Sequence, residues 1–307
     1  MKRLNRIIRT VQAIGRGLSS PKPHPAPEGI GVALGGGFAR GIAHIGILKV
    51  LEEEKIPLKF VAGTSVGALI GAIYCSGLRA AELEAVATQV RFKHFARWTL
   101  SRCGFASNQR MIGFLERVLQ VRTFEELRIP LAVAATDFIT GEGVVFRSGP
   151  LFDPVRASCA YPGMFLPVKI NGRLLVDGML AHTVPTVPLR EMGAPYVLAV
   201  NLRGKWTSNE GPRHIFEVIG QCFSIAQQMT CGVWQPAADL IVEPDVNGYK
   251  YDDFEHAAEL VRAGETAARA AIPQIRKWLD SAACAVPARR MRSPKAPAVQ
   301  PATLPAE

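Results

Sequence analysis

The stretch IGVALGGGFARG, residues 30–41, followed by FVAGTSVG, residues 60–67, decides the fold of this chain. Each part begins with a short apolar run and ends in a glycine-rich turn, after which apolar residues recur at helical spacing. The runs at 30–34 and 60–62 predict buried strands, and residues 41–54 and 65–76 predict helices. Strand–helix–strand–helix with short connections indicates parallel strands and an α/β class of fold.

The same reading extends over most of the 307 residues. Apolar runs bounded by turn residues predict further strands at 131–136, 144–146, 174–176, 196–200 and 240–242. Helical spacing predicts helices at 80–90, 108–120, 151–160, 213–230 and 254–279. Residues 79–128 are expected to be mostly helical, as an insertion or lid. We therefore expect one α/β domain at 28–280.

The charge of the chain lies at its two ends. The net charge is +10, yet residues 1–27 hold six basic residues and no acid, and residues 281–307 are also basic. The region between them is close to neutral, which argues against a nucleic-acid partner. Six scattered cysteines show no metal-ligand spacing, so we expect free thiols, no metal and no cofactor.

The two ends also differ from the domain in pattern. Residues 3–18 place apolar side chains at three- and four-residue steps among arginines, which predicts a basic amphipathic helix. Such a helix can lie on a membrane surface, dock on its own domain or remain a partly disordered arm. A Pro-rich linker completes an arm at 1–27, and residues 281–307 form an Ala/Pro-rich tail that we expect to be disordered.

No apolar run reaches the roughly 18–20 residues that a membrane-spanning helix needs. We therefore expect a cytoplasmic protein whose residues 3–18 contact the inner membrane face peripherally. The pattern carries no signal for an oligomeric state.

The second glycine turn, Gly63 to Gly67, has the form G-x-S-x-G with Ser65 at its centre. In a nucleophile elbow, this turn joins a strand to a helix and lifts the serine hydroxyl into the open. The position at a helix N-terminus also favours developing negative charge. A serine that merely caps the helix has the same local structure.

The first glycine turn, residues 35–41, does not fit a nucleotide-binding motif. The dinucleotide fingerprint requires glycine where Arg40 stands, and a P-loop requires Lys and Ser or Thr where Ile42 and Ala43 stand. An oxyanion hole requires only backbone N–H groups without bulky side chains nearby. Arg40 can then add charge or brace the loop.

The base that would activate Ser65 is not an obvious histidine. The five histidines that follow the linker are His44, His94, His182, His214 and His256, and none stands at a convincing position. Asp177 is better placed, because it ends a predicted strand at 174–176 and precedes Gly178. Taken alone, it also fits an ordinary turn aspartate, and its usual pKa of about 3.9 makes it a weak base.

These motifs resemble the patatin-like phospholipases. The segment ASCAYPGMFLP at 157–167 and the pair Asp253-Phe254 add to the resemblance, which covers roughly residues 29–275. It implies a three-layer α/β/α fold with a mainly parallel sheet and a Ser–Asp dyad without a catalytic histidine. By position, Ser65 is the nucleophile and Asp177 the base. The oxyanion and substrate-binding residues are Gly35, Gly36, Gly37, Phe38, Arg40, Gly41 and Val66, and Gly63, Gly67 and Gly178 support the motifs.

The expected function is a serine acyl hydrolase that cleaves lipid esters through an acyl-enzyme. A peptidase or thioesterase would use the same residues. The alternative of another class is a membrane-associated lipid-binding or regulatory protein with little turnover. One departure from the family pattern bears on this choice: Met179 stands where a small residue usually follows Asp-Gly, and it can narrow the site or desolvate Asp177.

Overall fold

The computed structural model describes residues 4–9, 29–99, 101, 103–202, 211–212 and 215–284. In this part of the chain, one eight-stranded sheet has the order β10-β9-β1-β2-β5-β8-β7, and β6 pairs with β5 off this path. A separate pair is formed by β3 and β4. The strands are β1 (Ile30–Leu34), β2 (Leu58–Thr64), β3 (Arg97–Trp98), β4 (Ala106–Ser107), β5 (Leu131–Asp137), β6 (Gly143–Phe146), β7 (Val168–Ile170), β8 (Arg173–Asp177), β9 (Val197–Val200) and β10 (Leu240–Val242).

The sheet is parallel from β10 to β5 and antiparallel beyond it. The pairs β10–β9, β9–β1, β1–β2 and β2–β5 are parallel. Strands β6 and β8 run antiparallel to β5, and β7 runs antiparallel to β8. Because β1, β2 and β5 are parallel, their carboxyl ends meet at one edge of the sheet, which is where ligands bind in open α/β sheets.

The two faces of the sheet bury side chains of different size. On β1, the large side chains of Val32 and Leu34 join the core formed with α2, α3 and α9, while Ala33 faces the core formed with α7. The same alternation places Val61 on the first face and Ala62 on the second. Both faces are therefore covered, as continuous apolar strand runs indicate.

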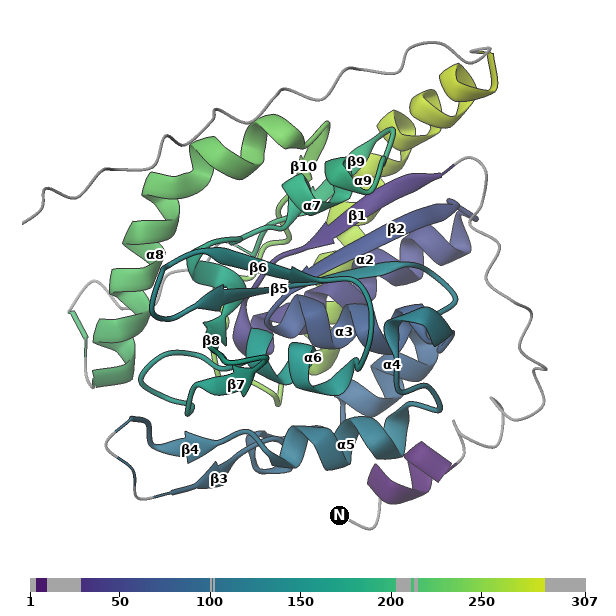
Figure 1. Cartoon of the computed structure of the whole chain (residues 1–307). Helices are drawn as coiled ribbons and strands as arrows, with labels where there is room; N and C mark the ends of the chain where they lie inside the picture. Colours follow the sequence, from purple (N-terminus) through teal and green to yellow (C-terminus); the bar gives the residue numbers. More distant parts are fainter. Residues whose placement is uncertain are drawn as a thin grey trace, which may run out of the picture.

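The helices are α2 (Ala43–Glu53), α3 (Val66–Cys75), α4 (Ala80–Ala87), α5 (Arg110–Val118), α6 (Phe152–Ser158), α7 (Thr186–Glu191), α8 (Ile215–Trp234) and α9 (Ala257–Cys284). Short 3-10 turns are η1 (Phe38–Ile42), η2 (Phe92–His94), η3 (Phe124–Glu126), η4 (Gly178–Leu180) and η5 (Gln235–Ala237). Figure 1 shows α2, α3 and α9 behind the sheet, α8 along one side and the β3–β4 pair beneath it. This arrangement confirms the expected α/β fold with a mainly parallel sheet flanked by helices.

Every strand expected from the sequence is present within a few residues of its expected bounds. The short elements β3, β4, β7 and α7 were not expected, and α9 continues to Cys284, past the expected domain end at 280. Strands of two or three residues are too short for side-chain alternation to reveal them. The insertion at 79–128 therefore carries a small antiparallel pair as well as the expected helices.

The described part of the N-terminal arm packs on the domain. Residues 4–9 are helical, and Leu4 and Ile8 are buried in the main core, with Ile7 half-buried against it. Of the alternatives for residues 3–18, docking on the domain is the one seen for 4–9, whereas 10–18 lie outside the described residues. The expected linker and the tail beyond Cys284 also lie outside them. Among the described helices, none is both long and apolar enough to cross a membrane.

Candidate active site

The turn between β2 and α3 places Ser65 in a strained backbone conformation. Its φ of 55° and ψ of −125° are rare for a residue with a Cβ. Ser65 is the N-cap residue of α3 and directly follows β2. Two glycines permit this turn. A Cβ on Gly63 would lie 2.5 Å from the Ala68 backbone nitrogen, and one on Gly67 would lie 2.2 Å from the Leu34 carbonyl oxygen. The predicted elbow geometry is therefore present.

Sheet register brings Asp177 to the level of Ser65. Strand β5 lies between their strands, with Ala134 opposite Thr64 on one side and Ala135 opposite Asp177 on the other. Small side chains on β5 leave room for the two groups to meet. The Ser65 hydroxyl donates to Asp177 Oδ2 at a distance of 2.6 Å, although the residues are 112 positions apart in the chain.

The carboxyl group of Asp177 is fully buried. Burial raises its pKa to about 7, even though hydrogen bonds from the Ser65 hydroxyl and the Met179 N–H favour the carboxylate. The side chain of Met179, two residues further on, is also buried, in the cluster that holds Tyr161. A carboxylate with a pKa near neutrality is a far better base than an ordinary aspartate.

Ser158 supports the elbow and was not singled out from the sequence. Its hydroxyl accepts from the Ser65 N–H at 2.8 Å and donates to the Ala134 carbonyl oxygen at 2.6 Å. The hydroxyl of Thr136 similarly donates to the Asp177 carbonyl oxygen at 2.9 Å. Ser158 lies in the segment 157–167 that carries the family resemblance, which was the available signal for it.

The first glycine turn lies directly over Ser65. A Cβ on Gly36 would be 3.6 Å from the Ser65 Cβ and 3.8 Å from the Met179 Cβ. The N–H groups of Gly35 and Gly36 donate to backbone carbonyls, at 3.1 and 3.3 Å. For the N–H of Gly37, no acceptor is found in the described part of the chain, so this group is available to a ligand.

His44 holds this turn in place and does not approach Ser65. Its imidazole is fully buried, with Nε2 2.8 Å from the Gly35 carbonyl oxygen. Burial lowers the pKa of His44 to about 4, so the ring is neutral and its Nε2–H donates to Gly35. From the sequence, His44 was considered only as a base, whereas its contact is with the loop.

The other predicted loop residues join the glycine turn to its neighbours. Phe38 has a φ of 52°, and its ring contacts Tyr161. The buried Arg40 donates through Nε to the Tyr249 carbonyl oxygen at 2.9 Å, which braces the loop against the region before α9. A Cβ on Gly41 would lie 2.2 Å from Val66, so the turn and α3 require this close approach.

Ser65 opens into an apolar pocket. Its lining includes six aromatic residues: Phe38, Phe92, Phe95, Tyr161, Phe165 and Phe254. A second apolar pocket lies between α3 and α4 and shares with the first Phe38, Val66, Leu69, Phe95 and Phe254. Its far end is lined by Leu83, Val86 and Ala87. The site thus combines a polar dyad with a long apolar lining.

The remaining histidines with described positions contact other groups. His256 pairs with Asp253, and His94 accepts from the Arg91 N–H. The backbone carbonyl of His182 accepts from Thr64, while His214 lies outside the described residues. In the described ranges, no cluster of histidine, cysteine or acidic side chains is arranged to hold a metal ion.

Cys159 is a further residue beside Ser65 that the sequence analysis did not distinguish from the other cysteines. It is buried and lines the pocket that contains Ser65. Burial, with the nearby Asp177 charge, raises the pKa of its thiol well above the usual value. Cys159 is therefore a neutral thiol and not a competing nucleophile.

The fold and the site together agree with a known family. The family model for patatin-like phospholipases matches residues 32–190, a span that contains both glycine turns, Ser65 and Asp177. The chain belongs to the patatin-like phospholipase family. This confirms the resemblance inferred from the sequence motifs.

Several curated proteins are similar to the chain. An uncharacterized NTE family protein of Mycobacterium tuberculosis is 34% identical over 212 residues, covering 64% of this chain and 52% of the relative. Lysophospholipase NTE1 of Mycosarcoma maydis is 29% identical over 252 residues, which is 75% of this chain and 13% of the relative. Patatin-like phospholipase domain-containing protein 6 of Homo sapiens is 34% identical over 186 residues, which is 56% of this chain and 13% of the relative.

The chain thus spans about half the length of the mycobacterial relative and about an eighth of the other two. Among solved structures, VipD from Legionella pneumophila aligns with a TM-score of 0.47 at 15% identity, covering 84% of this chain and 68% of VipD. That similarity adds nothing to the family assignment, which rests on the sequence.

Proposed function

We propose that the chain is a serine acyl hydrolase that cleaves fatty-acyl esters of phospholipids and related lipids. The observation that carries the proposal is the 2.6 Å hydrogen bond from the Ser65 hydroxyl to the buried Asp177 carboxylate, at the base of an apolar pocket. Acyl transfer requires a nucleophile that is hydrogen-bonded to its base, and here the nucleophile lies on a strained turn at a helix N-terminus.

The reaction proceeds in two halves. Ser65 Oγ attacks the ester carbonyl carbon while Asp177 takes the hydroxyl proton, and a tetrahedral intermediate forms. As the intermediate collapses, the ester C–O bond breaks, Asp177 returns the proton to the leaving alkoxide, and the acyl group remains on Ser65. Water then attacks the acyl-enzyme and gives its proton to Asp177. A second collapse releases the fatty acid and restores the Ser65 hydroxyl.

The negative oxygen of each intermediate needs hydrogen-bond donors. The N–H of Gly37 and that of Val66, in the first turn of α3, are the donors we assign to this oxygen, because neither has an acceptor in the described structure. The N-terminal end of α3 adds the partial positive charge of its dipole. Gly35 and Gly36 shape the loop, while their N–H groups donate within the protein.

The apolar pockets favour a lipid over a peptide. The pocket that contains Ser65 continues towards the pocket between α3 and α4, where a fatty-acyl chain would bury its methylene groups at about 0.8 kcal/mol each. The name lysophospholipase, carried by one relative, fits the same substrate class. The chain would then act peripherally at a membrane surface, as the sequence analysis expected, although Leu4 and Ile8 are buried and not free to insert.

The nucleophile is tested by fluorophosphonate labelling of the full chain. Wild-type protein should be labelled, and Ser65→Ala should lose both labelling and ester hydrolysis, the latter on the order of 10³-fold or more. Ser76→Ala, at the other end of α3, is the matched control, because its hydroxyl only bonds the Ile73 carbonyl oxygen. Strong labelling of Ser65→Ala would refute the assignment.

The base is tested by Asp177→Asn, which keeps the shape of the side chain. It should abolish hydrolysis of a soluble short-chain ester, whereas Asp153→Asn, on the exposed end of α6, should leave hydrolysis unchanged. Near-normal activity of Asp177→Asn would contradict the dyad. Labelling of Ser65 without turnover on phospholipids, lysophospholipids and glycerides would favour the alternative of a lipid-binding protein.

A further inference from the structure

Apart from Ile241 in β10, the exposed large apolar side chains of the described residues gather in three segments. Trp98 and Phe105 lie in and beside the β3–β4 pair, and Phe138 and Ile139 lie in the turn after β5. The third segment is the outer face of α8, which carries Ile215, Val218, Ile225, Met229 and Val233. Apolar surface concentrated in this way marks an interaction site rather than the scattered exposure of a normal surface.

Helix α8 has two apolar faces. Its exposed apolar residues follow one another at intervals of three, four or seven residues, which fall on one side of a helix, and Met229 is 83% exposed. The side of the helix next to this face packs inward through Ile219 and Phe223. Glu217 is the one charged residue in the sequence of this helix. The outer face is therefore a long, nearly uncharged apolar surface.

The segment around the β3–β4 pair is aromatic and basic. The sequence from 85 to 115 contains five basic residues, Arg91, Lys93, Arg97, Arg102 and Arg110, and no acid. Trp98 in β3 is 66% exposed, and its ring contacts that of Phe92. Tryptophan beside lysine and arginine is typical of surfaces that meet lipid headgroups, where the basic residues attract anionic lipids.

Both segments lead into the pocket that contains Ser65. From the β3–β4 side, Phe92 and Phe165 stack on each other and line this pocket. From the α8 side, the ring of Phe223 contacts that of Tyr161 at 5.3 Å, and Tyr161 lines the pocket as well. The exposed apolar surface is therefore continuous with the site through these aromatic pairs.

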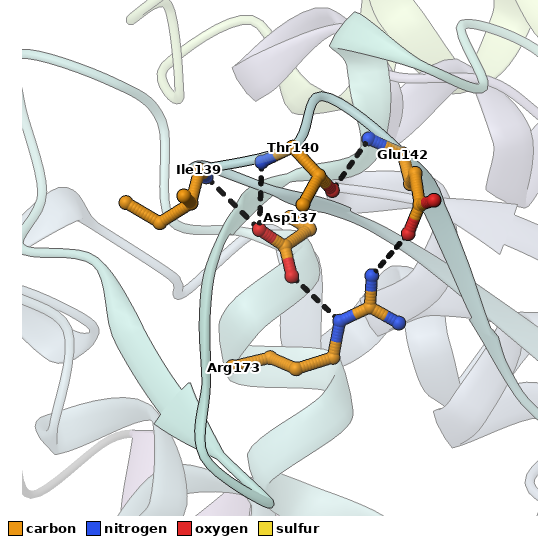
Figure 2. Close-up of polar contacts among 5 residues, drawn as sticks. All are labelled: Asp137, Ile139, Thr140, Glu142 and Arg173. Atoms are coloured by element: carbon orange, nitrogen blue, oxygen red, sulfur yellow. Dashed lines mark hydrogen bonds and ion pairs between the residues drawn. The ribbon is translucent and has the colours of Figure 1, made fainter. Parts of the chain in front are cut away.

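The turn after β5 is held rigidly by a buried acid. Figure 2 shows Asp137 accepting from the N–H groups of Ile139 and Thr140, at 2.9 and 3.1 Å, and pairing with Arg173 at 2.6 Å. Arg173 also bonds Glu142 and lowers the pKa of Asp137, which stays ionised. The side chain of Ile139 points away from this polar cluster (Figure 2) and is 75% exposed.

We propose that these three segments form one docking surface for a lipid bilayer with anionic headgroups. The apolar face of α8 and the tip of the β5–β6 turn enter the bilayer interface, and Arg91, Lys93, Arg97 and Arg110 contact the headgroups. A lipid can then pass from the bilayer into the Ser65 pocket along continuous apolar surface. The delivery of a lipid to Ser65 rests on the proposed function. The test of the docking surface, in contrast, measures vesicle binding and not turnover.

Charge and continuity argue for a bilayer as the occupant. A bilayer accepts an uncharged apolar helix and a basic aromatic edge at the same time, because its interior is apolar and its surface carries the phosphates. The same surface also surrounds the entrance that a lipid substrate must use. Self-association through α8 and binding of another protein are outcomes that the test separates.

The experiment is flotation of the full chain with vesicles of phosphatidylcholine, with and without about 30% phosphatidylglycerol. The wild type should bind the anionic vesicles more strongly, and added salt should weaken binding. Ile225→Glu with Met229→Glu on α8 should reduce binding by at least about tenfold. Ala270→Glu with Gln274→Glu, both on the exposed side of α9, adds the same charge and should bind as the wild type.

A second pair of variants tests the basic edge. Lys93→Glu with Arg97→Glu should also reduce binding to anionic vesicles by about tenfold or more and remove its salt dependence. Arg262→Glu with Lys277→Glu on α9 is the charge-matched control. Hydrolysis of a soluble short-chain ester should be the same in all of these proteins, which shows that they are folded.

The two proposals fail in different ways. Unchanged vesicle binding of the α8 pair would overturn the docking surface whatever the activity. If light scattering showed a changed oligomeric state of the α8 pair while its vesicle binding stayed unchanged, the face of α8 would be a contact between copies of the chain. That result would also overturn the docking surface. A third outcome would refute the proposed function and support the docking surface. In that outcome the wild type binds anionic vesicles but hydrolyses no ester, and the α8 pair loses vesicle binding.

Discussion

The two walls of the Ser65 pocket are held in different ways. On the polar wall, Ser65, Asp177 and Ser158 are buried and joined by hydrogen bonds of 2.6–2.8 Å that reach into β5. On the apolar wall, Phe92 and Phe165 meet only by ring stacking, and Trp98 beyond them is exposed. Hydrogen bonds fix single atoms, whereas apolar contacts stabilise roughly in proportion to area.

This difference separates two kinds of requirement. The polar wall sets the chemistry, so a displacement of one atom should affect the rate for every ester. The apolar wall sets which lipid binds, so its changes should be graded and should depend on the acyl chain. Variants that keep the fold and alter one wall at a time therefore test whether the two roles are separate.

The largest effect is expected from Gly36→Ala on the polar wall. A methyl group there would lie 3.6 Å from the Ser65 Cβ, an ordinary contact that the fold tolerates, yet it fills the space above the nucleophile. We expect kcat/KM to fall by about 10²-fold or more for short- and long-chain esters alike, as misplacement near 1 Å does. Steady-state kinetics and thermal unfolding of the variant provide the measurement.

Gly113→Ala is the matched control for this substitution. It adds the same methyl group on α5, where only the flexible end of Arg117 is near. Its activity should equal that of the wild type. If Gly36→Ala retained full activity, the glycine turn would not lie over the reacting carbonyl, and the assignment of the polar wall would be wrong.

A smaller and selective effect is expected from Ala87→Phe on the apolar wall. Ala87 lines the far end of the pocket between α3 and α4, away from Ser65. A phenyl ring there should exclude about two methylene groups of a long acyl chain, each worth about 0.8 kcal/mol. Hydrolysis of long-chain relative to short-chain esters should therefore fall by about tenfold.

The control for this change is Ala81→Phe, which places the same ring on the exposed side of α4. Overpacking by Ala87→Phe is expected to cost about 1–3 kcal/mol of stability, so both variants are compared with the wild type by thermal unfolding. An equal loss for all chain lengths would show that the two walls do not have separate roles.

The smallest effect concerns the pH dependence of hydrolysis. Asp177 acts as a base only when ionised, so kcat/KM of the wild type should rise with pH through about 7, the pKa to which burial raises this carboxyl. Met179→Ala should admit water beside Asp177 and move this rise to lower pH. Rate profiles on a soluble ester between pH 5 and 9 measure the shift.

Met192→Ala, a half-buried methionine on the other face of the sheet, controls for the loss of a thioether. Its profile should match that of the wild type. The stability of the folded state should change with pH in the direction opposite to activity. Because the folded state holds a proton on Asp177 up to about pH 7 and the unfolded chain only to about pH 4, this group stabilises the fold less as pH rises between them. A profile of Met179→Ala that did not move would show that Met179 does not keep water from Asp177.

Much of the fold could be predicted because its central strands are buried on both faces. Residues 30–34 and 131–137 therefore appear as unbroken apolar runs with glycine or aspartate at the end. Ser65 and Asp177 could be predicted for the same reason, since each follows such a run at the carboxyl edge. The glycines beside them narrow the choice, because only glycine permits those approaches.

Other features could not be predicted, since they depend on contacts between distant residues. Ser158 looks like any serine at the end of a short helix, and its role depends on Ser65, 93 positions away. His44 has the spacing of a core residue, which it is, while its bond to Gly35 depends on how the helix folds back on the loop. The outer face of α8 has the same period as its inner face, so the sequence does not say which face is covered.

The register of the sheet has a consequence for how activity would be lost. Ser65 and Asp177 meet because β5 pairs with β2 at Thr64 and with β8 at Asp177. A slip of one residue along either strand would turn the side chains to the opposite face, so no intermediate pairing retains a partly formed dyad. Catalytic competence is thus an all-or-none property of the assembled sheet, and denaturant should remove hydrolysis and sheet structure in a single transition.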